Sequence, residues 1–237
     1  MEFLYEGTII NQTLHKKQPM YIKRLYLEDL PIIEHVQETV IESLSEKESL
    51  QPLSTEEFLF ILNERGVMVG AFAEDQLIGF RALLVPEIDR EHLGYDIGLA
   101  EEEFPKVIYQ EISAVLPEYR GNRLQQTLAE VVMKELPLLK EQFRYVCCTV
   151  APMNIPSLKD KFSQHMYIKA LKRKYNNMER YIFMKDLKDP PLRFTDYISV
   201  KLDDFDKQRK LLEEGYVGLG FQLVGGFYEL QFAKPIL

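Results

Sequence analysis

The sequence LPEYRGNRLQQTL, residues 116–128, lies near the middle of this chain of 237 residues and decides how the rest is interpreted. A strand-forming run precedes it, Pro117 ends that run, and a helix-forming run follows it. A strand, a tight turn and a helix N-terminus in this order present unpaired N–H groups, which bind phosphate. The stretch contains a single glycine, Gly121, so the clearance between its backbone and a phosphate is in question.

Helices and strands alternate ahead of this stretch. Ser54 and Glu57 form a capping box that predicts the start of a helix. A short turn at Glu74-Asp75 between two apolar runs predicts a β-hairpin. The predicted elements are a strand at 21–26, helices at 30–44 and 54–66, hairpin strands at 67–73 and 76–85, a loop at 86–105 over one end of the sheet, and a strand at 106–117.

The pattern continues behind the stretch and then changes. A helix from Leu124, a strand at 144–151, a short helix at 154–164 and a hairpin of 166–175 with 179–187 around Asn176-Asn177 are predicted. The paired prolines of 188–193 predict a linker. A strand, a helix and two strands joined by Gly225-Gly226 follow it. The whole order predicts a mixed α/β sheet with helices on both faces.

The composition excludes several classes of function. A net charge of -8 disfavours a nucleic-acid partner; it suits a cationic substrate, or it serves solubility alone. No apolar run is long enough to span a bilayer, and acidic residues stand where a signal peptide carries Lys or Arg, so we expect a cytoplasmic protein without a membrane partner. Cys147 and Cys148 are expected to be buried residues of a core strand, and the four histidines have no metal spacing. We therefore expect no metal.

Two motifs in this order resemble the GCN5-related N-acetyltransferase (GNAT) superfamily. The first is the loop RGNRLQ, Arg120 to Gln125, within the wording V-x-P-E-Y-R-G-N that is typical of bacterial members. The second is Asn154, followed by a short helix in APMNIPSLKDKF. The resemblance covers roughly residues 20–187 and implies a GNAT-like acyl-CoA N-acyltransferase domain at 1–187. It leaves 190–237 as a small C-terminal β-α-β-β extension packed on that domain.

The resemblance implies acetyl-CoA as cosubstrate and assigns residues to it. The loop would wrap the pyrophosphate, the backbone of Val115 would pair with the pantetheine arm, and Asn154 would contact the cofactor from the neighbouring strand end. In the superfamily the central strand also ends in a bulge. The implied cofactor-binding residues are Val115, Arg120, Gly121, Asn122, Arg123, Leu124, Gln125 and Asn154.

Three positions depart from the superfamily's pattern. Arg123 and Gln125 stand where its members have small residues. We expect Arg123 at helical φ/ψ with its amide towards the ligand, and its side chain clamping a phosphate or facing solvent rather than blocking the groove. Lys161 stands where many members place a Tyr that protonates the leaving thiolate. Its ammonium would stabilise that thiolate, or it is a solvated charge on the helix.

The strand before the loop carries the candidate catalytic groups. By alternation Glu111 lies on the same face as Tyr109, Ser113 and Val115. A carboxylate on such an apolar strand is costly unless it is paired or functional, so Glu111 is either a general base or a structural ion-pair partner. Tyr109 is a second catalytic candidate on that face. His92 is a base, a ligand or a structural residue.

The leading hypothesis is therefore an N-acetyltransferase. It would move an acetyl group from acetyl-CoA by direct transfer to a primary amine of a small molecule. The alternative is a non-catalytic CoA- or metabolite-binding module, or a regulator, of the same fold. A third hypothesis is a pure interaction protein, and a homodimer stays open in each case.

Overall fold

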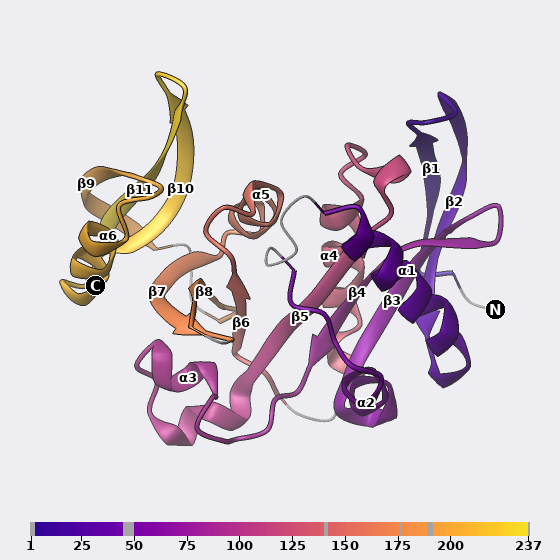
Figure 1. Ribbon diagram of the computed structural model, residues 1–237. Helices are drawn as coiled ribbons and strands as arrows, with labels where there is room; N and C mark the ends of the chain where they lie inside the picture. Colours follow the sequence, from indigo (N-terminus) through magenta and orange to yellow (C-terminus); the bar gives the residue numbers. More distant parts are fainter. Residues whose placement is uncertain (1–2, 45–49, 140–141, 176, 189–191, 237) are drawn as a thin grey trace. The chain divides into compact units, whose positions relative to one another are not determined.

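The computed structural model describes residues 3–44, 50–139, 142–175, 177–188 and 192–236 (Figure 1). Its contacts divide the chain into two compact units. The first unit comprises Met1–Pro86 with Tyr109–Gln142, and the second comprises Glu87–Ile108 with Phe143–Leu237. The mixed α/β class predicted from the sequence is confirmed.

The first unit contains antiparallel strands in the order β1-β2-β3-β4-β5. Glu74 and Asp75 join β3 and β4 with φ of 49° and 64°, so the predicted hairpin and its turn are confirmed. The strands are β1 (Tyr5–Asn11), β2 (Lys16–Leu25), β3 (Gly66–Ala73), β4 (Gln76–Leu84) and β5 (Val107–Val115). Strand β1 was not predicted from the sequence, and β2 begins at Lys16 rather than at residue 21 as predicted.

Helices cover both faces of this sheet. Successive side chains of a strand point to opposite faces. Phe80 of β4 meets the ring of Phe58 edge-on at 6.0 Å, whereas its neighbour Arg81 donates to the carbonyl oxygen of Gln125 at 3.0 Å. The helices of the unit are α1 (Leu30–Glu42), α2 (Thr55–Phe60) and α4 (Leu124–Lys134), with short turns η1 (Leu27–Asp29), η3 (Ile61–Arg65), η5 (Pro117–Tyr119) and η6 (Leu136–Leu138). Thus α2 and α4 lie on opposite faces.

The predicted capping box at the start of α2 is confirmed. The amide N–H of Glu57 donates to Ser54 Oγ at 3.2 Å, and the amide N–H of Ser54 donates to the Glu57 carboxylate at 2.7 Å. The box satisfies two N–H groups that the helix itself leaves unpaired. It also fixes the position of the Glu57 carboxylate, whose negative charge acts on Glu111 of β5.

The second unit contains strands in the order β6-β8-β7-β10-β11-β9. Cys147 and Cys148 are buried free thiols on β6, as predicted. Part of the 86–105 segment is helical, which corrects the expectation of a plain loop. Of the predicted linker 188–193, residues 189–191 lie outside the described residues, and Arg193 already belongs to β9. The elements are α3 (Leu93–Asp96), η4 (Glu101–Lys106), β6 (Tyr145–Val150), α5 (Ile155–Ser163), β7 (Tyr167–Lys174), β8 (Met178–Asp186), β9 (Arg193–Lys201), α6 (Phe205–Glu213), β10 (Val217–Val224) and β11 (Phe227–Ile236). Among the described residues, no helix combines the length and apolar character needed to cross a membrane.

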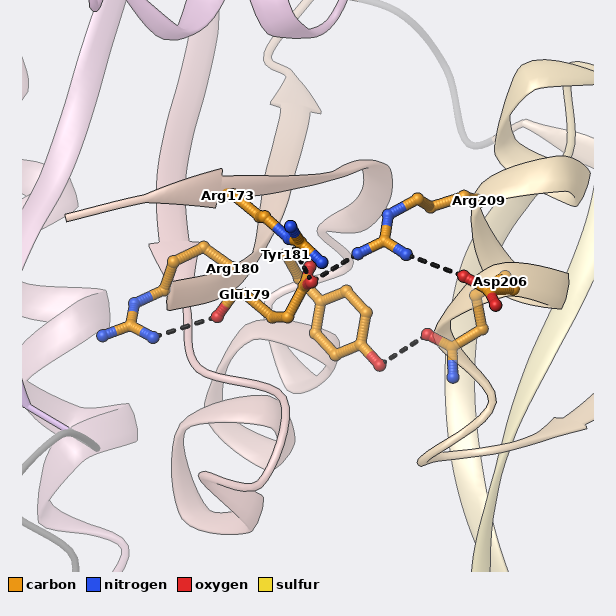
Figure 2. Close-up of polar contacts among 7 residues, drawn as sticks. Arg173, Glu179, Arg180, Tyr181, Asp206 and Arg209 are labelled. Atoms are coloured by element: carbon orange, nitrogen blue, oxygen red, sulfur yellow. Dashed lines mark hydrogen bonds and ion pairs between the residues drawn. The ribbon is translucent and has the colours of Figure 1, made fainter. Parts of the chain in front are cut away.

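A buried polar contact joins α6 to the β7–β8 hairpin (Figure 2). The Tyr181 hydroxyl donates to Gln208 Oε1 at 2.7 Å, and the exposed fraction of each side chain is 0%. Gln208 Nε2 in turn donates to the carbonyl oxygens of Lys201 and Leu202 at 2.8 and 3.0 Å. One amide side chain therefore satisfies three groups that burial has removed from water.

We expect Gln208→Leu to lower the free energy of unfolding by about 3 kcal/mol, because it leaves a buried hydroxyl and two carbonyls without their partner. Urea unfolding measures the change. Gln222→Leu, the same substitution at an exposed position of β10, is the matched control and should alter stability by less than about 0.5 kcal/mol. Equal effects of the two substitutions would contradict the role given to Gln208.

Candidate active site

The chain passes from β5 to α4 through two residues with left-handed backbone. After η5, Gly121 has a φ of 81° and Arg123 has a φ of 58° with a ψ of 21°. The helix begins at the next residue, Leu124. The predicted sequence of strand, turn and helix is confirmed.

The loop presents unpaired backbone N–H groups. Within the described part of the chain, those of residues 121–125 have no hydrogen-bond acceptor, whereas those of Gln126 and Thr127 both bond to the carbonyl of Arg123 at 3.0 and 3.1 Å. Free amides at the first turn of a helix carry partial positive charge. Five in succession can bind an anion that has several oxygens, such as a pyrophosphate.

The N-terminal strand holds this loop in place. The Asn122 side chain accepts from the N–H of Ile10 at 3.1 Å and donates to its carbonyl at 2.8 Å, so it pairs with the edge of β1 as a strand residue would. Its amide nitrogen also donates to the carbonyl of Tyr119 at 3.0 Å. Beside it, the N–H of Gln12 donates to the carbonyl of Glu118 at 2.7 Å. The side chain of Asn122 therefore has a structural task.

This support was not predicted from the sequence, where no element was expected before residue 20. The signal was present but weak: the β-branched run in GTII, the turn-forming residues NQT after it, and then the strand residues. A short edge strand with few apolar residues is recognised mainly by its partner.

Arg123 corrects one expectation. Its backbone is not at helical φ/ψ, because the residue occupies the left-handed region as the N-cap of α4. Its side chain is exposed, which agrees with the expected solvent-facing position. The left-handed conformation favours glycine. A small residue at this position, as is typical of the superfamily, therefore relieves the backbone and also leaves room for the phosphate.

The side chain of Arg120 turns back on the end of β5. Its Nε donates to the carbonyl oxygen of Val115 at 3.3 Å, and its Nη2 donates to Ser43 Oγ at 2.8 Å. Burial lowers the pKa of this guanidinium. The N–H of Leu116 donates to Ile78 of β4, so the polar groups of Val115 point away from β4 by alternation. Arg120 thus bonds to the carbonyl of Val115, the backbone group that the resemblance assigns to the pantetheine arm.

Arg81 connects the start of α4 to the sheet. Its exposed fraction is 0%, and it donates from Nη1 to the carbonyl of Gln125 at 3.0 Å and from Nη2 to Gln110 Oε1 at 2.6 Å. Gln125, which stands where the superfamily has a small residue, is therefore fixed through its backbone carbonyl rather than through its side chain. The sequence signal for Arg81 was a single cation inside the apolar run QLIGFRALLV, which costs free energy unless the cation is bonded.

Strand β5 carries the candidate catalytic groups. Tyr109, Glu111 and Ser113 are half-buried, and Gln110 and Ile112 are buried. The prediction that Tyr109, Glu111, Ser113 and Val115 share one face is wrong: Tyr109 pairs with Leu84 of β4 and Ser113 with Arg81, which point to opposite faces of the sheet.

Arg81 of β4 pairs with Ser113 of β5, and Leu83 of β4 pairs with Gln110 of β5. Two β5 residues therefore lie opposite the single β4 residue between these pairs. This bulge lies at Glu111 and Ile112, several residues before the strand end where the resemblance places it.

Glu111 is the group with the altered acidity on β5. Burial raises the pKa of its carboxyl to about 7, and the negative charge of Glu57 on α2 adds to the rise. A carboxyl with this pKa exchanges its proton near neutral pH, which is what a general base requires. No ion pair of Glu111 occurs among the described residues, so the structural alternative has no partner there.

Two further predicted residues lie on α5 in the second unit. Asn154 is its N-cap, and its Oδ1 accepts from the N–H of Ser157 at 3.1 Å. The Lys161 side chain is buried and its Nζ lies 3.2 Å from the Asp160 carboxylate. Lys161 is therefore not the solvated helix charge that the sequence suggested.

His92 has a structural role. It is 1% exposed, its Nδ1 accepts from the N–H of Gly94 at 3.1 Å, and its ring stacks on Phe104 at 4.4 Å. Burial lowers the pKa of the imidazole. The described residues contain no group of three His, Cys, Asp or Glu side chains placed to hold a metal ion.

Known structures share this fold, although no protein-family model and no curated protein matches the sequence. Arabidopsis thaliana NAA60 in complex with acetyl-CoA aligns with a TM-score of 0.55 and 16% identity over 72% of this chain and 99% of its own. An N-acetyltransferase from Staphylococcus aureus aligns at 0.53 and 14% over 71% and 99%. The acetyltransferase of the GNAT family from Streptococcus pneumoniae aligns at 0.51 and 15% over 71% and 99%. At such low identity the likeness shows the fold: this chain has the GNAT fold, as the resemblance predicted.

We expect Arg123→Gly to raise the free energy of unfolding by up to about 1 kcal/mol. Relief of the left-handed backbone contributes roughly 1–2 kcal/mol, and the greater freedom of glycine in the unfolded chain offsets part of it. Arg123→Ala removes the same side chain without that relief and is the matched control. Urea unfolding that finds the glycine variant no more stable than the alanine variant would refute the prediction.

The pKa of Glu111 makes stability depend on pH. A folded pKa of about 7 against 4.5 unfolded means that the folded state holds the proton more tightly. This contribution is complete below about pH 4.5 and is lost as the pH rises through 7. We expect the stability advantage of Glu111→Gln over the wild type to grow by about 3 kcal/mol between pH 4.5 and 8. Glu130→Gln controls for the loss of one charge, and an advantage that stays constant with pH would contradict the assignment.

Proposed function

We propose that this protein is an N-acetyltransferase that moves an acetyl group from acetyl-CoA directly to a primary amine of a small molecule. The observation that carries the proposal is the row of unpaired N–H groups at residues 121–125, placed at the first turn of α4 in a GNAT fold. A pyrophosphate suits this row because its oxygens accept several hydrogen bonds at once.

The chain's own residues would bind the cofactor as follows. The amides of Gly121 to Gln125 hold the pyrophosphate, helped by the dipole of α4. The N–H and carbonyl of Val115 pair with the pantetheine arm once the Arg120 guanidinium has left that carbonyl. The freed guanidinium then offers a charge-assisted bond to a phosphate. The resemblance also gives Asn154 a cofactor contact, and this stays part of the proposal.

Acetyl-CoA would supply a thioester whose C–S bond breaks as the C–N bond of the amide forms, and the CoA thiolate that leaves would take up the proton that Glu111 receives from the amine. Glu111 accepts the proton that the attacking amine loses, since its raised pKa makes it a base near pH 7. The Tyr109 hydroxyl, two residues before Glu111 on β5, orients that amine. Lys161 takes no part in this scheme because its ammonium faces Asp160.

The acceptor class follows from charge. The chain carries a net charge of -8, and an acidic protein raises the local concentration of a cationic amine.

A second candidate, a CoA-binding module without catalysis, is favoured by one observation. The Arg120 guanidinium occupies the carbonyl of Val115, and exchange of that bond for the pantetheine arm costs free energy. Measurement of acetyl-CoA binding together with amine-dependent thiol release separates the two functions.

We expect acetyl-CoA to bind the wild type, and Gly121→Ala to weaken the affinity at least about tenfold, because an alanine at a φ of 81° distorts the loop. Gly98→Ala is the matched control, since Gly98 has a φ of 74° and a Cβ added there would meet nothing within 4 Å. Calorimetric titration measures binding, and thiol release with a panel of primary amines measures transfer, with Glu111→Gln as the catalytic variant.

The outcomes are distinct. Binding with amine-dependent thiol release that Glu111→Gln removes would support the transferase. Binding that Gly121→Ala weakens, without transfer to any amine, would identify the binding module instead. Absence of acetyl-CoA binding to the wild type, or equal weakening by both glycine substitutions, would refute the cofactor site.

A further inference from the structure

A groove with a volume of about 520 Å³ lies within the second unit, outside the candidate active site. It is lined by β7, by the C-terminal half of α6 with the residues that follow it, and by Asp96 and Ile97 at the end of α3. Its volume is in the range of sites that bind small molecules. No role in the proposed function uses it.

Cationic residues outnumber acidic residues in the lining of the groove. The cationic residues are Lys169, Lys172, Arg173 and Arg209, and the acidic ones are Asp96 and Glu213. The Asp96 carboxylate is already engaged in an ion pair with Lys174 Nζ at 2.9 Å. The chain as a whole carries a net charge of -8, so this concentration of positive charge is a local feature.

Lys169 is the most informative of these residues. Its side chain is half-buried, and its ammonium has no hydrogen bond or ion pair within the described ranges. Burial lowers its pKa, and no charged neighbour contributes to that shift. A partly desolvated cation without a partner costs free energy, which a bound anion would offset.

The two arginines of the groove are held in position (Figure 2). The Glu179 carboxylate accepts from Arg173 Nε at 3.0 Å and from Arg209 Nη2 at 2.5 Å. Arg209 Nη1 also contacts the exposed Asp206 at 3.1 Å. One carboxylate thus holds two guanidinium groups, whose remaining N–H groups need little reorganisation to meet a ligand.

Apolar side chains complete the lining. Ile97, Leu171, Leu212 and Tyr216 come from α3, β7, α6 and the residue before β10. Such a surface accommodates the body of an organic ligand, while the cations fix its charged end.

We propose that this groove binds a small organic dianion, with Lys169 as the main contact for its charged group and the apolar residues against its body. The charged group is a phosphate or a pair of carboxylates, since both present the oxygens that lysine and arginine recognise. The proposal is independent of acetyl transfer.

Calorimetric titration at low ionic strength with phenyl phosphate and, separately, with phthalate tests the proposal and distinguishes the two kinds of charged group. We expect at least one probe to bind the wild type, and Lys169→Gln to weaken that binding at least about tenfold. Lys169→Arg keeps the charge and should retain most of the affinity. Lys207→Gln removes an exposed charge on α6 outside the lining and should change nothing.

Failure of both probes to bind the wild type would overturn the proposal. Equal affinity of the wild type and Lys169→Gln would overturn it as well, because the probe would then occupy another site, such as the loop before α4. Thermal unfolding of each variant without probe shows whether the substitution itself has disturbed the fold.

Discussion

The geometry of the candidate site depends on one buried guanidinium. Arg81 is fully buried, and its fork joins the carbonyl of Gln125, in the first turn of α4, to the side chain of Gln110 on β5. A buried cation is tolerated only where such bonds are made. Because the two partners belong to the helix start and to the strand before it, they fix where the free amides lie. A lysine, with one point charge, would not hold both.

The capping box at the start of α2 also affects the pKa of Glu111 on β5. The capping box holds the Glu57 carboxylate at the N-terminus of α2, and its charge adds to the rise in the pKa of Glu111 on β5. Burial supplies the larger part of that rise. The half-buried Glu111 can exchange a proton with a ligand or solvent, while the buried Gln110 and Ile112 hold the strand in the core. Stability and reactivity are thus divided between neighbouring residues of one strand.

The sequence predicted the features that short-range chemistry determines. The capping box at Ser54, the hairpin turns at Glu74-Asp75 and Gly225-Gly226, and the strand, turn and helix around Gly121 depend on neighbouring residues and are confirmed. The left-handed backbone of Arg123 was missed, because an arginine seldom adopts it and only the loop imposes it. Strand β1 was missed although its partner β2 is the next strand along the chain, because an edge strand with few apolar residues has a weak pattern. The burial of Lys161 was missed because a lysine on a short helix is ordinarily exposed.

The bond between Asn122 and Ile10 has a consequence for the order of events during protein synthesis. The two residues are 112 positions apart, so the edge of β1 emerges from the ribosome long before its partner. Until then that edge presents unpaired N–H and carbonyl groups, which other chains can join. Closure of so long a segment is entropically costly and comes late in folding. The loop that we assign to the cofactor would therefore be among the last parts of the first unit to reach its final form.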